Sequence, residues 1–185
     1  MAKKQKKTSR PVKAAAKKKV APAKKTTKKV SAIPAGYHSL TPYLVFKKAA
    51  AAMSFYTTAF GAKETVRMAA PDGSIMHAEM RIGDSTFMMG EEAAAMGVKS
   101  PETLGGSPSG LMWYTPDVDK AFAKAVAAGA TAEQPPTDMF WGDRYAKVVD
   151  PFGHRWSIAT HVEDVSPKEM DRRGREFVAQ MAAQP

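Results

Sequence analysis

The chain has 185 residues, a formal net charge of +10 at pH 7 and no cysteine. Disulfides, thiolate metal sites and cysteine nucleophiles are therefore excluded. The charge is unevenly distributed, because residues 1–30 hold thirteen of the 28 Lys and Arg residues and no Asp or Glu. The remaining segment of about 155 residues is mildly acidic and long enough for one domain with a sizeable core.

Residues 1–33 are rich in Lys, Ala and Pro, so we predict a disordered basic tail. Such a tail can bind phosphates without sequence preference. We expect non-specific nucleic-acid contact through residues 1–30, or else a solvated extension with no specific role. No aromatic residue is interleaved with the lysines, so base stacking is not indicated.

Membrane insertion and secretion are not indicated by the sequence. No apolar run approaches the roughly 20 residues that a membrane-spanning helix needs, and the N-terminus lacks the apolar stretch of a secretory signal. We expect a cytoplasmic protein without membrane contact, located at the nucleoid if the tail binds nucleic acid.

The folded part begins with a strand at Leu44–Phe46 and a helix at Ala49–Phe60, which is followed by the stop residue Gly61. Apolar side chains recur along this helix at helical spacing. Three further strands are expected after it, near Thr65–Met68, Ile75–Ile82 and Thr86–Met89, with a turn at Pro71–Gly73.

The same order recurs after a shift of 68 residues. Met112–Tyr114 is expected to be a strand and Val118–Ala128 a helix, with Gly129 as its stop residue. A hairpin then follows, in which Asp150–Gly153 supplies the turn chemistry between two β-rich segments. Its aromatic residues are interpreted either as hairpin core or as a grip for a flat apolar molecule.

These elements predict an α+β fold of two βαβββ modules, at about residues 37–92 and 109–163, which curve into a cup between them. The linker 91–108 is expected to be mobile and to serve either as a connection or as a lid. Ser166 and Glu169 form a capping box, so a helix is expected over residues 166–182. It should dock on this domain or on a second subunit.

Five segments of the folded part form a recognisable series: TPYLVF, FYTTAFGA, PDGSIMHAEMRIGDS, DVDKAFAKAVAAGA and FWGDRYAKVVDPFGHRWSIATHVE. This series resembles the glyoxalase/bleomycin-resistance/dioxygenase superfamily, also called vicinal oxygen chelate proteins, and within it the PhnB-like branch. The resemblance covers residues 37–163. It implies paired βαβββ modules, often in a homodimer.

The resemblance also implies four positions at which enzymes of the superfamily hold a divalent metal. Here these positions carry Thr41, Phe87, Ser109 and Ser157. None of them is His, Asp or Glu, and Phe cannot coordinate a metal at all. The resemblance allows a divalent metal, but these residues disfavour it, and we expect no cofactor.

His77 and Glu79 are the candidates for catalysis, because residues two apart on a strand share a face. They could act as a base and its orienting carboxylate, or they could be an exposed pair on a sheet surface. An enzyme built on them would be a glyoxalase-superfamily lyase or oxidoreductase with a non-standard site.

The expected cup has apolar and aromatic walls, three hydroxyl groups and one cation. Such a lining suits a small organic ligand, either anionic or aromatic. We therefore expect a metal-free binding protein; the alternatives are the enzyme above and a nucleic-acid-associated protein acting through its tail. The residues expected to bind the ligand are Thr41, Tyr43, Phe87, Ser109, Trp113, Trp141, Arg144, Tyr145 and Ser157.

Overall fold

The computed structural model describes Met1 and residues 30–183. The chain divides into two units, Met1–Ala32 and Ile33–Pro185, and almost all of the tail predicted for residues 1–33 lies outside the described residues. Within the described part, no helix is both long and apolar enough to cross a membrane. The helices and strands of the described residues all belong to the unit Ile33–Pro185.

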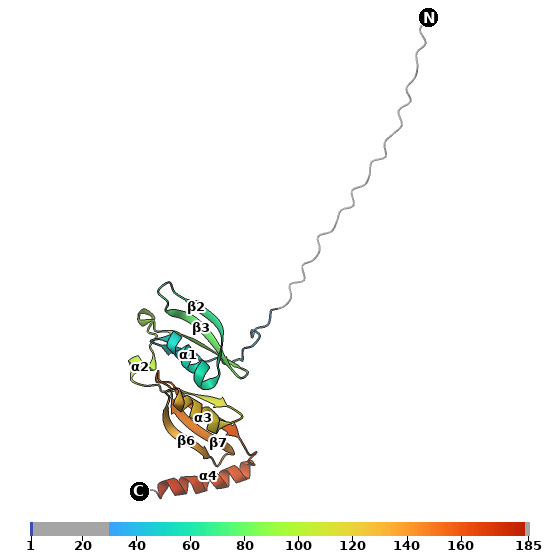
Figure 1. Cartoon of the computed structure of the whole chain (residues 1–185). Coiled ribbons are helices and arrows are strands. Elements are labelled where there is room, and N and C mark those ends of the chain that lie inside the picture. The colour runs from blue at the N-terminus through green and yellow to red at the C-terminus, as the bar shows by residue number, and fades with distance from the viewer. Residues whose placement is uncertain (2–29, 184–185) are drawn as a thin grey trace. The chain divides into compact units, whose positions relative to one another are not determined.

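The first module is a four-stranded sheet with one helix (Figure 1). Its strand order is β1-β4-β3-β2; β1 runs parallel to β4, and the other neighbours are antiparallel. The turn Gly61 adopts a left-handed conformation with φ 66° and ends the helix as predicted. The elements are β1 (Tyr43–Phe46), α1 (Ala49–Phe60), β2 (Lys63–Ala69), β3 (Ile75–Ile82) and β4 (Ser85–Glu91).

The second module repeats this topology with the order β5-β8-β7-β6. The predicted α+β fold of paired βαβββ modules is confirmed. The predicted βαβββ pattern implies strand β6, but its position was not predicted, because Pro135 and Pro136 obscure the strand signal; proline is tolerated there because β6 is an edge strand. The elements are β5 (Gly110–Tyr114), α3 (Val118–Ala127), β6 (Thr131–Asp138), β7 (Asp143–Val149) and β8 (Arg155–His161).

The linker between the modules contains η1 (Ala94–Met96) and α2 (Pro101–Leu104). Sequence reasoning predicted a mobile connection here. In the structure the Glu92 carboxylate accepts hydrogen bonds from the backbone N–H and hydroxyl of Ser100, at 2.7 and 2.6 Å, and Ser100 is fully buried. The linker is therefore anchored at one internal point.

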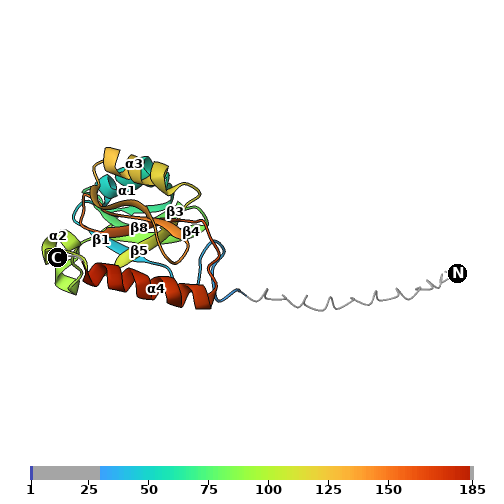
Figure 2. The same ribbon diagram turned by 90° about the horizontal axis from the view of Figure 1, so that it is seen from below.

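The C-terminal helix α4 (Pro167–Ala182) begins at the predicted capping box. The Ser166 hydroxyl accepts a hydrogen bond from the Glu169 backbone N–H. Phe177 packs on Phe140 in the β6–β7 loop, with ring centroids 5.2 Å apart. Figure 2 shows α4 on the opposite side of the strands from α1 and α3.

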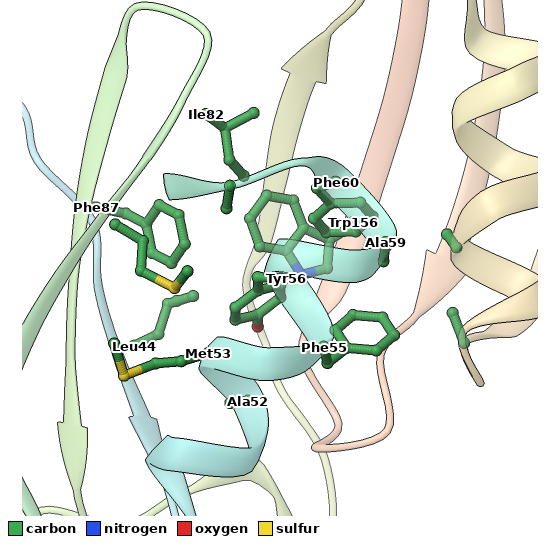
Figure 3. Packing of buried hydrophobic residues seen from close by; sticks show 14 of the residues in the cluster. Leu44, Ala52, Met53, Phe55, Tyr56, Ala59, Phe60, Ile82, Phe87 and Trp156 are labelled. Carbon is green, nitrogen blue, oxygen red and sulfur yellow. The ribbon is translucent and has the colours of Figure 1, made fainter. Parts of the chain in front are cut away.

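The core lies between the two sheets and the adjacent helices α1 and α3. Side chains that alternate along a strand point to opposite faces; we call the face towards α1 and α3 the helix face and the other the open face. Tyr56 and Phe60 of α1 meet Phe87 of the first sheet and Trp156 of the second (Figure 3). The two modules thus share one core.

A buried carboxylate joins the modules at this core. Asp150 Oδ2 accepts hydrogen bonds from the Tyr56 hydroxyl at 2.5 Å and from Trp156 Nε1 at 3.2 Å. Its Oδ1 accepts the backbone N–H groups of Phe152 and His154, both at 2.9 Å. Burial, reinforced by the Asp150 charge, raises the pKa of Tyr56 well above its ordinary value. The hairpin turn therefore fastens the second module to α1 of the first.

Candidate functional site

A cavity of about 470 Å³ opens between the two modules, beside the β3–β4 turn and the edge strand β5. Most of its lining side chains are apolar, and the exposed ones include both polar residues and the apolar Leu40 and Met112. The residues that line it are His38, Leu40, Pro42, Ile82, Gly83, Asp84, Ser85, Thr86, Phe87, Leu111, Met112, Trp113, Tyr114 and Trp156.

Three aromatic rings form the inner wall. Phe87 and Trp156 have ring centroids 6.2 Å apart and are both buried (Figure 3). Trp113 packs on Phe60, which also contacts Trp156, with centroid distances of 5.1 and 4.8 Å. Since Phe60 fixes both indoles, the wall is held rigidly by α1.

Two of the residues expected to bind a ligand, Phe87 and Trp113, line this cavity. Both belong to the helix face, contrary to the predicted grouping of Trp113 with Ser157. In the register of β5 and β8, Ser157 is opposite Met112 instead, and Trp113 is opposite Ile158. Trp113 and Ser157 were expected to line one cup, but this register places Leu111 and Trp113 on the helix face and Ser157 on the open face.

Thr41 and Ser109 lie next to the cavity lining in sequence. The Thr41 hydroxyl donates to the His38 carbonyl at 3.3 Å. The Ser109 carbonyl accepts from the Ser107 hydroxyl at 2.8 Å, and Ser109 is exposed.

A second group of expected site residues gathers on the open face of the second sheet. The hydroxyl groups of Tyr145 and Ser157 are 2.6 Å apart, and the ring of Trp141 meets the ring of Tyr145 edge-on at 5.7 Å. This group is separated from Trp113 by the thickness of the sheet.

Sequence reasoning missed a polar network on the same open face. Asp143, which is nearly buried, accepts hydrogen bonds from the Tyr114 hydroxyl at 3.0 Å, Trp141 Nε1 at 3.0 Å and His161 Nδ1 at 2.8 Å. Asp164 is 3.1 Å from the other nitrogen of His161. The two carboxylates, Asp143 first, raise the pKa of His161. To find this network from the sequence, one would have had to predict the pairing of Asp143 with His161 across β7 and β8.

The open face of the first sheet carries a similar arrangement. His77 Nε2 is 3.2 Å from Glu79 Oε1, and the Tyr37 hydroxyl donates to Glu79 Oε2. This hydrogen bond raises the pKa of Tyr37. Tyr43 lies beside His77, with ring centroids 6.2 Å apart. The Glu79 side chain is only 11% exposed, so the alternative of an exposed surface pair does not apply to Glu79.

Arg144, expected near a ligand, points instead towards α3. Its guanidinium forms two hydrogen bonds with Asp119, at 2.7 and 2.8 Å, and one with Asp138 at 3.1 Å. These bonds, with Asp119 first, raise the pKa of Arg144 above its ordinary value. On the helix face of β7, Arg144 thus links this strand to α3 and to the end of β6.

Residues 38–158 match the model of the Glyoxalase/Bleomycin resistance protein/Dioxygenase superfamily. The chain belongs to this superfamily. An uncharacterized protein of Mycobacterium tuberculosis (strain ATCC 25618 / H37Rv) is 43% identical over 135 residues, which cover 71% of this chain and 79% of that protein.

Solved structures of the superfamily fold agree with this assignment. TioX from Micromonospora sp. ML1 is 27% identical with a TM-score of 0.54, over 66% of this chain and 98% of TioX. A PhnB protein from Bacillus cereus, 18% identical with a TM-score of 0.52 over 66% of this chain and 99% of its own, shares the fold.

The superfamily's metal-holding positions do not fit a divalent ion in this chain. Phe87 is buried in the aromatic wall and Ser157 bonds to Tyr145 on the opposite face, so these two do not converge. Neither they nor Thr41 and Ser109 offer an imidazole or a carboxylate. Among the described residues, no cluster of three or more His, Asp or Glu side chains could hold a metal.

Proposed function

We propose that the protein binds a small, partly apolar organic molecule without a metal, in the cavity between its two modules. The observation that carries this proposal is the cavity of about 470 Å³ with four aromatic side chains, Phe87, Trp113, Tyr114 and Trp156, in its lining. This volume falls within the roughly 300–1,000 Å³ of small-molecule sites, which combine apolar walls with a few polar groups. The polar lining residues here are His38, Asp84, Ser85 and Thr86.

The proposal extends to a homodimer. Tyr43, Met112 and Tyr114 of the two open faces are 50, 46 and 59% exposed, and large exposed apolar groups on edge strands favour association. Among the described strands, β1, β2, β5 and β6 each have a neighbour on one side only; we propose that the edges at β1 and β5, which carry these exposed side chains, meet a second copy. Light scattering after size exclusion should give twice the chain mass; a monomer at all concentrations would contradict this part.

Ligand binding is best tested by tryptophan fluorescence against a panel of metabolites and drugs. Trp113→Ala removes a cavity wall, so affinity should fall about thirtyfold, corresponding to about 2 kcal/mol. Trp141→Ala is the matched control, because Trp141 is not among the residues that line the cavity. A ligand that responds to Trp141→Ala, Tyr145→Phe or Ser157→Ala but not to Trp113→Ala would move the site to the open face.

Metal independence has its own test. After dialysis against Zn²⁺, Ni²⁺, Mn²⁺ or Fe²⁺ and removal of loose ions, metal analysis should find no stoichiometric ion. One tightly held ion per chain that is lost in His77→Gln or Glu79→Gln would contradict the proposal.

A second candidate function is an enzyme with a non-standard site, favoured by the two imidazole–carboxylate pairs. In each pair a largely buried carboxylate orients a histidine, as general bases require. Turnover of glyoxalase-superfamily substrates by the purified protein, lost in Glu79→Gln or Asp143→Asn at unchanged stability, would favour this candidate.

The nucleic-acid role of the tail remains a prediction for residues outside the described part. We propose salt-sensitive, sequence-independent binding through residues 1–30, and with it a cytoplasmic, nucleoid-associated location. Fluorescence anisotropy with labelled DNA and RNA should detect binding by the full chain and not by residues 31–185. Equal binding by both proteins at low salt would show that the tail is not responsible.

A further inference from the structure

We propose that the cavity selects flat aromatic molecules that carry a positive charge and discriminates against anions. The inference rests on the proposed function, because it assigns a charge class to the ligand of the same cavity. It reverses the expectation of an anionic ligand, for which Arg144 was the expected partner.

The charges around the cavity favour a cation. Among the described residues that line it, Asp84 is the one carboxylate, and none is Lys or Arg. Asp84 lies in the β3–β4 turn at the mouth, where its Oδ1 accepts the Ser85 hydroxyl at 2.8 Å. Its side chain is 88% exposed, and His38 Nε2 is 4.0 Å from its Oδ2. The Asp84 carboxylate would therefore attract a cation bound at the mouth.

Two of the hydrogen-bond donors on lining side chains are already used within the protein. Trp156 lines the cavity, but its Nε1–H is donated to Asp150 behind the wall. The hydroxyl of Tyr114 is likewise donated to Asp143. Since these donors are already used, the two side chains contribute ring surface, and ring faces attract cations through their negative quadrupole.

The nearby cations are directed elsewhere. Arg144 is held by Asp119 and Asp138 on α3 and β6. Lys120 and Lys124 line a separate groove on α3, which shares Trp113 with the cavity. Among the described residues, an anion in the cavity would thus meet no lining Lys or Arg.

The test compares two flat probes with the full-length protein at 150 mM salt: proflavine, which is cationic, and 1-anilinonaphthalene-8-sulfonate, which is anionic. Proflavine should bind more tightly, and Asp84→Asn should weaken it roughly threefold to fivefold, as expected for one solvent-exposed charge. Asp84→Lys should weaken proflavine further and strengthen the sulfonate. Asp72→Asn is the matched control, an exposed aspartate that also accepts a serine hydroxyl in the β2–β3 turn.

The outcomes separate this inference from the proposed function through Trp113→Ala. If the sulfonate binds as tightly as proflavine, or if Asp84→Asn and Asp72→Asn behave alike, the charge selectivity is overturned. The proposal that the cavity is the ligand site is still supported if Trp113→Ala weakens the binding of whichever probe binds. If neither probe depends on Trp113, both the charge class and the cavity as ligand site are overturned.

Discussion

Helices α1 and α3 occupy equivalent positions in the two repeats, yet they are stabilised in different ways. Seven of the 12 residues of α1 are buried, and its N-cap residue Lys48 makes no side-chain capping bond; instead Glu91, at the end of β4, accepts the Ala49 backbone N–H at 3.1 Å. Only three of the ten residues of α3 are buried, and Asp117 caps it by accepting the Lys120 backbone N–H at 2.9 Å. Burial fixes α1, whereas polar contacts at its surface fix α3.

This difference explains why the cavity has a rigid wall on the side of α1. Tyr56 and Phe60 of α1 contact side chains of both sheets, and Asp150 holds the Tyr56 hydroxyl from the second module. On α3, Asp119 contacts its own module through the exposed pair with Arg144. The two modules therefore share a topology. Within the described residues, α1 joins the modules through a buried hydrogen bond, whereas α3 has no equivalent bond.

The substitution with the largest expected effect on this difference between α1 and α3 is Asp150→Ala. It leaves the Tyr56 hydroxyl, Trp156 Nε1 and two backbone N–H groups without their acceptor. We expect a loss of about 3 kcal/mol or more in the free energy of unfolding, measured by urea denaturation. A loss no larger than that of Asp117→Ala would show that burial of α1 does not depend on this carboxylate.

Tyr56→Phe isolates one bond of that cluster. The ring and its aromatic contacts remain, whereas the hydroxyl that reaches Asp150 is lost. Asp150 Oδ2 still accepts Trp156 Nε1, so the expected loss is about 1–1.5 kcal/mol. Thr57→Val is the neighbouring control, because the Thr57 hydroxyl only bonds back to Met53 within α1; it should change stability by less.

Asp117→Ala tests the other side of the comparison. Removing the capping carboxylate from α3 should lower the free energy of unfolding by about 1 kcal/mol. Asp117→Ser keeps an acceptor at the cap and should recover most of this loss. Equal stability of the alanine variant and the native chain in calorimetry would argue that α3, too, is held by burial.

The smallest expected effect is a pH dependence from His161. Its pKa is raised by Asp143 and Asp164, so the folded chain holds this proton more tightly than the unfolded chain. The contribution of this proton to the free energy of unfolding is complete below 6.5, the ordinary pKa of histidine. It is lost as the pH rises through the raised pKa of His161. Urea midpoints should decline across this window, and His161→Gln should flatten the decline. If the urea midpoint of the variant declines with pH as steeply as that of the native chain, other titratable groups cause the decline.

Local signals in the sequence predicted the elements well, because they are encoded by neighbouring residues. The bounds of α1 follow from its apolar periodicity and from Gly61. The polar, proline-containing β6 carries no such signal. Alternation along β5 shows that Leu111 and Trp113 share a face, but it does not show which face meets the helix, so it could not separate Trp113 from Ser157.

The site was harder to predict, because its contacts join distant segments. Asp143 and His161 are brought together by the pairing of β7 with β8. Asp150 was interpreted as turn chemistry; its bond with Tyr56 spans 94 residues. Arg144 is paired with Asp119 through the packing of α3 on the sheet. None of these partners can be identified from spacing along the chain.

The shared core also has a consequence for folding during synthesis. The first module is complete at Glu91, but Asp150 and Trp156 follow about sixty residues later. At roughly 5–20 residues per second, the ribosome needs about 3–12 seconds to supply them. Throughout that interval the Tyr56 and Phe60 side chains lack their partners from the second module. The nascent chain should therefore be a good substrate for chaperones that recognise exposed aromatic residues.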